Sequence, residues 1–250
     1  MIRVAAVGDL HVDAEGAEVL GPRLARLADD ADVLLLAGDL TRCGGRREAD
    51  ALAAELARVP VPVVAVLGNH DHHAGEPREV GARLAAVGVR VLEGEQLLLD
   101  VRGSRVGIVG TIGFGGGFEG ACGSDFGEPE MKAFIGHTQR LAARLEQRLA
   151  ATEADVRIVL LHYAPVPETL FGERLEIYPF LGSYLFAEAV DRIGADLVVH
   201  GHAHAGSERG MTRGGVRVRN VALPLINRPY RVFSFTGREL HVDGALEIAP

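Results

Sequence analysis

The sequence predicts an α/β fold in which a largely parallel β-sheet carries helices on its faces. Two observations support this. Short apolar runs alternate along the first ninety residues with segments that have apolar residues at helical spacing. Hydrophobic residues make up 48% of the chain, enough for a sizeable core, which excludes a disordered protein. Because no internal repeat or low-complexity linker is visible, we expect residues 1–250 to form one domain.

The N-terminal elements alternate between strands and helices. We expect strands at Ile2–Val7, Val33–Ala37 and Val61–Leu67, and helices at Glu15–Ala28, Arg46–Arg58 and Glu79–Ala86. Each helical segment places its apolar residues on one face. This strand–helix–strand order is typical of parallel strands connected by crossover helices.

After residue 88 the pattern changes to shorter connections, which indicates a second half of the sheet structure. Further strands are expected at Val89–Leu92, Gln96–Val101, Arg105–Val109, Val156–Leu161, Asp196–His200, Val216–Val221, Arg231–Phe235 and Leu240–Ile248. Amphipathic helices are expected at Gly136–Ala150 and Ser183–Ile193, and a glycine-rich irregular stretch at Gly110–Pro129. The complete pattern predicts two sheet halves with helices outside.

The charge and cysteine content limit the classes of partner and compartment. The chain has 26 basic and 34 acidic residues, a net charge of −8, which disfavours a nucleic-acid partner. Its two cysteines, Cys43 and Cys122, are too few for a disulfide framework or a cysteine-based zinc site. No apolar run approaches the ~20 residues of a membrane span, and no signal segment is visible. We therefore expect a cytoplasmic protein without a membrane span. The sequence does not determine its oligomeric state.

Potential metal ligands follow the predicted strands. The strand ends lead into Asp9-Leu10-His11, Gly38-Asp39, Gly68-Asn69-His70-Asp71, His162 and His200-Gly201-His202-Ala203-His204. Any one of these segments alone is commonly a turn with a surface histidine. In a parallel sheet, however, the carboxyl ends of the strands meet at one crevice. The five segments together therefore predict a metal site.

These motifs, in this order, resemble the motif set of the calcineurin-like metallophosphoesterases. The resemblance extends from residue 9 to residue 204. It implies the fold of that family, which is two mixed β-sheets packed as a sandwich and flanked by helices, with a binuclear metal site on loops at one edge. It also implies a hydrolase that acts on phosphoester bonds.

The resemblance assigns each metal-ligand position to one of two ions. Asp9, His11 and His204 would bind one metal, Asn69, His162 and His202 the other, and Asp39 would bridge them. Carboxylate, amide and imidazole ligands suit divalent transition metals, with Mn²⁺ first and Fe or Zn²⁺ as alternatives. His200 is not a motif position, and we expect it to pack at its strand end.

Two residues near the ligands are candidates for substrate chemistry. By resemblance, His70 is the catalytic histidine, which does not bind metal and either gives a proton to the leaving oxygen or stabilises charge there. Arg42 occupies the position where the family's protein phosphatases have an acid that pairs with this histidine. Its guanidinium suits a substrate phosphate, although it could equally be a solvated loop residue. Asp71 is expected to be a helix N-cap.

The segment Gly113–Gly117 has two possible structural interpretations. It is either a mobile flap that brings Phe114 or Phe118 to the substrate, or an ordinary connection; its glycine content favours the flap. The segments Tyr163-Ala164-Pro165 and Tyr178-Pro179-Phe180 are candidates for the facing wall of the site.

The predicted function is hydrolysis of a small phosphomonoester or phosphodiester, with a cyclic nucleotide or a nucleotide-like molecule as possible substrates. The resemblance implies in-line attack by a metal-bridging hydroxide. One alternative is a nuclease like the family's DNA-repair members, which the acidic charge and the lack of a capping insertion disfavour. Another is a non-catalytic scaffold of the same fold, which would be expected to lack His70.

Overall fold

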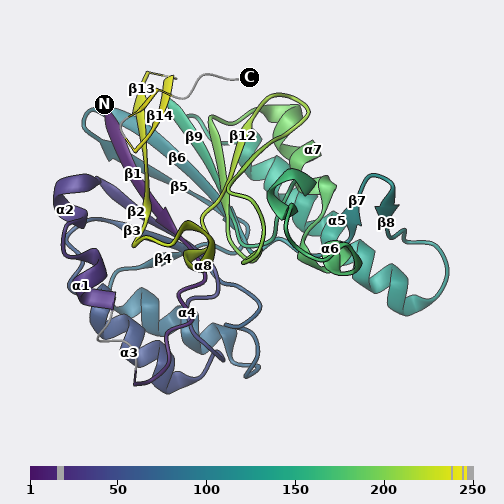
Figure 1. Cartoon of the computed structure of the whole chain (residues 1–250), viewed down its shortest axis with the longest axis horizontal. Coiled ribbons are helices and arrows are strands. Elements are labelled where there is room, and N and C mark those ends of the chain that lie inside the picture. The colour runs from purple at the N-terminus through teal and green to yellow at the C-terminus, as the bar shows by residue number, and fades with distance from the viewer. Residues whose placement is uncertain (16–19, 238, 244, 247–250) are drawn as a thin grey trace.

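Two mixed β-sheets lie face to face in the computed structural model (Figure 1), which describes residues 1–15, 20–237, 239–243 and 245–246. The first sheet has the order β15-β14-β13-β1-β2-β3-β4. These strands span, in that order, Ala245–Leu246, Glu239–Val242, Arg231–Thr236, Ile2–Val7, Val33–Ala37, Val63–Val66 and Arg90–Val91. The second sheet has the order β11-β12-β10-β9-β6-β5. Its strands span Arg209–Met211, Arg217–Asn220, Leu197–His200, Val156–Leu161, Ser104–Thr111 and Glu95–Val101.

The main core lies between the sheets and follows from alternation along each strand. In β1, Val4 and Ala6 pack between the sheets, whereas Ala5 and Val7 point to the helices outside. The first three strands are parallel, as predicted, and β13 joins β1 in antiparallel orientation, which makes the sheet mixed. The predicted sandwich of two mixed sheets flanked by helices is therefore confirmed.

Helices cover the outer face of each sheet (Figure 1). The first sheet is covered by α1 (Leu20–Leu24), α2 (Leu27–Asp30), α3 (Arg46–Leu56) and α4 (Pro77–Ala86). The second sheet is covered by α5 (Pro129–Ala150) and α7 (Tyr184–Ile193). A short α8 (Leu223–Ile226) precedes β13. Within the described residues, no helix is long and apolar enough to cross a bilayer.

A small lobe extends beside the second sheet, on the right of Figure 1. It contains the hairpin β7 (Gly117–Phe118) and β8 (Ala121–Cys122), the 3₁₀ turns η2 (Pro167–Leu170) and η3 (Leu175–Ile177), and α6 (Tyr178–Leu181). Because the loop after β9 leads directly into this lobe, the lobe lies next to the carboxyl ends of the strands.

Three of the expected elements differ most from those in the structure. The helix expected at Glu15–Ala28 is two short helices, Leu20–Leu24 and Leu27–Asp30, with a turn at residues 25–26; residues 16–19 lie outside the described part. Helix α5 begins at Pro129 and not at Gly136, because proline is well suited to the first helical turn. The strand expected at Leu240–Ile248 is β14 and β15, and residues 247–248 lie outside the described part.

Candidate metal centre

The loops after β1, β2, β9 and β10 bring two groups of potential metal ligands together. The first group contains Asp9, His11, Asp39 and His204, and the second contains Asp39, His162 and His202. Within each group, one donor atom of every residue lies within 4.8 Å of the others. Asp39 belongs to both groups, which is the arrangement that a bridging carboxylate requires.

The loop after β3 adds Asn69 to the second group. The Nε2 atom of His162 lies 2.9 Å from Oδ1 of Asn69 and 3.3 Å from Oδ1 of Asp39. The structure thus brings all seven sequence-predicted ligand positions to one edge of the sandwich. Six of them form two groups that share Asp39, and Asn69 lies beside the second group.

The backbone at these ligands is unusual. Asp9, His11, Asp39 and His202 have positive φ angles of 58°, 46°, 50° and 69°. Residues with a Cβ atom rarely adopt this left-handed conformation, and it collects at functional sites, where the surrounding structure holds it. Here the loops cross-link: His11 N donates to the Asp39 carbonyl at 3.0 Å, and His202 N donates to both carboxylate oxygens of Asp9 at 3.0 Å.

Two glycines allow the ligand loops to pack this closely. A Cβ atom at Gly68 would collide with the carboxylate and the backbone nitrogen of Asp39. A Cβ atom at Gly201 would collide with the carboxylate of Asp9. The glycines that precede Asn69 and His202 in the sequence are therefore required by the close approach of two loops.

Burial favours the neutral form of most of these ligands. Burial raises the pKa of Asp9 to about 6, against the opposing hydrogen bond with His204, and also raises the pKa of Asp39. It lowers the pKa of His162 to about 3 and lowers that of His202. These two imidazoles are neutral at physiological pH, as metal ligands must be.

The protonation state of His162 indicates whether a cation fits this site, because it determines which ring nitrogen has a free lone pair. Its Nδ1 lies 2.9 Å from the carbonyl oxygen of Ala37, which can only accept a hydrogen bond, so Nδ1 carries the proton. The lone pair of Nε2 then faces the Asp39 oxygen at 3.3 Å. With Asp39 ionised, two acceptors converge on one point, where a divalent cation would be stabilised. A second hydrogen bond that orients the ligand histidine is typical of metal sites.

His70 lies beside the first group of ligands. Its ring is 4.5 Å from that of His11, and its Nε2 is 3.9 Å from Oδ2 of Asp39. Its Nδ1 donates a hydrogen bond of 2.7 Å to the backbone carbonyl of Arg42. The backbone of Arg42, and not a carboxylate, thus orients His70. The Arg42 side chain is 66% exposed, with Nη1 3.7 Å from Oδ2 of Asp13.

The expectation that Asp71 caps a helix is wrong. Its carboxylate is fully buried and accepts hydrogen bonds from the backbone nitrogens of Leu40, Thr41 and Gly68 at 3.1, 2.8 and 2.8 Å. The Thr41 hydroxyl donates a fourth at 2.6 Å. Asp71 therefore joins the loop that carries Asp39 to the loop that carries Asn69. Nothing in the sequence indicated this role for Thr41.

The structure also argues against a mobile flap at Gly113–Gly117. Gly116 N donates to the carbonyl of Pro179 at 2.7 Å, and Gly117 N donates to that of Gly182 at 2.9 Å. Phe118 is buried and packs against Tyr178 in the core of the lobe. The segment is a packed connection, in which a Cβ atom at Gly115 would collide with the backbone of Pro179 in α6 and one at Gly117 with the backbone of Ala121.

The proposed facing wall contains a tyrosine close to the metal ligands. The ring of Tyr163 lies 4.3 Å from that of His202, and the residue is only 8% exposed. Among the described residues, its hydroxyl has no hydrogen-bond partner, although that atom is not sealed from solvent. Burial raises the pKa of Tyr163 to about 12, so the hydroxyl keeps its proton.

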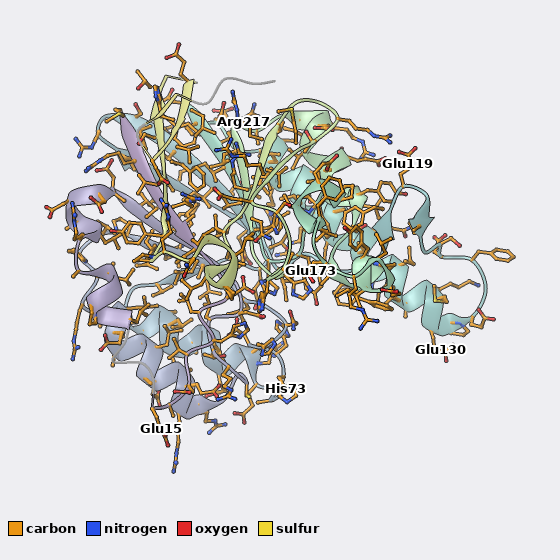
Figure 2. All side chains as sticks on the ribbon, viewed as in Figure 1. Glu15, His73, Glu119, Glu130, Glu173 and Arg217 are labelled. Atoms are coloured by element: carbon orange, nitrogen blue, oxygen red, sulfur yellow. The ribbon has the colours of Figure 1, made fainter. Side chains whose placement is uncertain are left out.

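His200 and the loop after His204 complete the surroundings. His200 is buried at its strand end, as predicted, with Nε2 2.9 Å from the hydroxyl oxygen of Thr169. The carboxylate of Glu173 accepts a hydrogen bond from Ala205 N at 2.7 Å, which attaches the lobe to the ligand loop. Figure 2 shows Glu173 between the α3–α4 half of the molecule and the lobe.

Comparison with known proteins identifies the family. The model of the calcineurin-like phosphoesterases matches residues 2–206, so the chain belongs to this family. The family is binuclear and metal-dependent, and this chain carries the candidate ligands. The protein is therefore a metal-dependent phosphoesterase.

Solved structures share the fold at low sequence identity. Phosphopantetheinyl hydrolase from Mycobacterium tuberculosis is 18% identical, with a TM-score of 0.64 and 88% of each chain covered. TT1561 of Thermus thermophilus is 18% identical, with a TM-score of 0.61 and 96% and 97% of the two chains covered. The GAP50 anchor of the inner membrane complex of Plasmodium is 12% identical, with a TM-score of 0.54 and 89% and 72% covered. None of the curated proteins compared matches the sequence.

Proposed function

We propose that this chain hydrolyses a small phosphomonoester or phosphodiester with two divalent metal ions held at its sheet edge. Asp9, His11 and His204 would hold one ion, Asn69, His162 and His202 the other, and Asp39 both. The observation that carries the proposal is the shared position of Asp39 between two groups of converging donors. The mixture of carboxylate, amide and imidazole donors favours Mn²⁺, with Fe or Zn²⁺ as alternatives.

When bound, such a pair of ions supplies positive charge for the phosphoryl oxygens and makes a bound water more acidic. The residues of the chain supply orientation and proton transfer. Because Nδ1 of His70 donates to the Arg42 carbonyl, its Nε2 is the atom that remains to face the substrate. A proton on Nε2 can pass to the leaving oxygen, a step worth ~10²–10⁴-fold in rate.

Tyr163 supports the same reaction as a hydrogen-bond donor. Its ring packs beside His202, and its hydroxyl lies within electrostatic reach of the Asp39 carboxylate. Because this hydroxyl keeps its proton up to high pH, it can donate to a phosphoryl oxygen of the substrate. Arg42, whose side chain is exposed and whose backbone contacts His70, is a candidate for a second substrate contact.

The test is reconstitution followed by a substrate panel. Chelator-treated protein would be loaded with Mn²⁺, Fe²⁺ or Zn²⁺, and the ions per chain counted by mass spectrometry. Phosphomonoesters, phosphodiesters and cyclic nucleotides would then be assayed. We expect about two ions per chain and hydrolysis that chelation abolishes. Stoichiometric metal without hydrolysis of any phosphoester would contradict the proposed activity.

A further inference from the structure

Five aromatic side chains form a continuous cluster that begins at the candidate metal centre. We define the aromatic cluster as Tyr163, Phe114, Phe134, His137 and Phe180. The Phe114 ring lies 5.8 Å from Tyr163, 5.1 Å from Phe134 and 4.8 Å from His137. Phe134 lies 6.5 Å from Phe180. These tilted and edge-to-face contacts are the favoured geometries of aromatic pairs.

The cluster is assembled from four segments that are far apart in the sequence. Phe114 follows β6, Phe134 and His137 are on the first half of α5, Tyr163 follows β9, and Phe180 is on α6. Its inner member, Tyr163, is buried, whereas its outer members are open to solvent: Phe180 is 61% exposed and His137 is exposed. An exposed aromatic surface next to an active site is a typical ligand-binding feature.

The cluster is physically joined to the metal ligands. The Tyr163 ring is 4.3 Å from that of His202, so Phe114 lies no more than about 10 Å from this ligand ring. The backbone carbonyl of Phe180 lies 3.4 Å from Nε2 of His202, which can donate to it. A phosphoester bound at the metals could therefore reach the cluster with its organic part.

The chemistry of the cluster selects one kind of group. All five of its members are aromatic rings. Burial and the nearby Arg140 lower the pKa of His137, so its ring is uncharged at neutral pH. Flat apolar rings with exposed edges and faces bind a planar aromatic group by stacking, which is worth ~1–3 kcal/mol per base in nucleic-acid binding.

We propose that the aromatic cluster binds a planar aromatic group of the substrate, so that the substrate class is a phosphoester that carries a nucleobase or an aryl ring. For the phosphoryl part of the substrate, this proposal rests on the proposed function. Binding of the aromatic ring depends only on the aromatic cluster. The two halves therefore require separate measurements.

The first measurement compares substrates that differ only in the ring. One pair is AMP and ribose 5-phosphate; the other, for diester hydrolysis, is adenosine 5′-(methyl phosphate) and ribose 5-(methyl phosphate), because a nitrophenyl group would itself be an aryl ring. The selectivity is the ratio of kcat/KM for the two members of a pair. In Phe180→Ala this ratio should fall by ~5- to 150-fold, with the base-lacking substrate unaffected. The matched control is Phe126→Ala, because Phe126 is 88% exposed on the same lobe but outside the cluster.

The second measurement does not depend on turnover. Metal-free protein labelled with 4-fluorophenylalanine gives one ¹⁹F signal for Phe180, assigned by its loss in Phe180→Ala. Adenosine should shift this signal, and ribose should not; the Phe126 signal should respond to neither. A shift without hydrolysis of any phosphoester would support the ring site and overturn the proposed function. An unshifted signal, or an unchanged selectivity ratio in an active Phe180→Ala enzyme, would overturn the ring site.

Discussion

Replacement of Asp71 by asparagine should destabilise the metal-free protein and loosen the ligand loops. Asn has the same shape but offers one acceptor oxygen where Asp71 offers two. In the structure, Oδ2 accepts from the nitrogens of Leu40 and Gly68, and Oδ1 accepts from the nitrogen and the hydroxyl of Thr41. The Thr41 hydroxyl can rotate, so the least costly orientation places the new amide nitrogen at Oδ1. The Thr41 N–H is then left without an acceptor.

The magnitude follows from these contacts. A buried donor without a partner costs ~1–3 kcal/mol, and hydrogen bonds to a charged acceptor are stronger than those to a neutral one. The burial that raises the pKa of Asp71 is a cost that Asn avoids, which limits the net loss. We expect a decrease in the free energy of unfolding of ~2–4 kcal/mol, measured by urea denaturation without metal so that ligand binding does not mask it.

Two further variants make this prediction specific. Asp50→Asn removes a surface ion pair with Arg83 and should cost less than ~1 kcal/mol. Thr41→Ser keeps the hydroxyl and should also cost little, whereas Asp71→Asn should weaken metal binding as well as folding. If Asp71→Asn unfolded at the same urea concentration as Asp50→Asn and bound metal normally, Asp71 would not hold the two loops together.

Three other perturbations have definite expected results. His70→Asn should keep both metals and lower turnover by ~10²–10⁴-fold, with a smaller loss for nitrophenyl esters, which need little protonation; equal losses for good and poor leaving groups would exclude a proton donor. Gly201→Ala should abolish metal binding, measured by calorimetry, because its Cβ collides with Asp9; normal affinity would disprove the close approach. Burial raises the pKa of Asp32, but hydrogen bonds from Arg102 and Arg3 outweigh this effect, so the pKa is lowered in the folded state. The ionised Asp32 therefore stabilises the fold above about pH 4, and this stabilisation is lost below that pH. Wild type and Asp32→Asn should therefore differ in unfolding free energy at pH 7 and converge as the pH falls; a constant difference would contradict this.

Much of the candidate metal centre was predictable because its residues follow strands. The parallel order of β1, β2 and β3 places Asp9, Asp39 and Asn69 at one edge, and apolar periodicity is enough to locate those strands. The division of the ligands into two groups came from the resemblance to the family. The structure adds the physical reason for the glycines, namely that loops cross within contact distance of Asp9 and Asp39.

Other features depend on contacts between distant segments, which periodicity does not encode. Asp71 has a sequence context that suits a helix cap, but its carboxylate turns inward to a neighbouring loop. Gly113–Gly117 has the composition of a mobile loop, but the backbone of Pro179 crosses it. The aromatic cluster draws on α5 and α6, and the early start of α5 at Pro129 places Phe134 within a helix.

The number of ions that each chain binds shows whether Asp39 is shared by two metal sites. Wild type, His11→Ala and Asp39→Ala would be reconstituted with Mn²⁺, exchanged into metal-free buffer and analysed by mass spectrometry, with their fold checked by circular dichroism. The predicted result is about two ions in wild type, about one in His11→Ala, because only the first group loses a donor, and fewer than one in Asp39→Ala. Two ions retained in folded Asp39→Ala would contradict the shared position of this carboxylate.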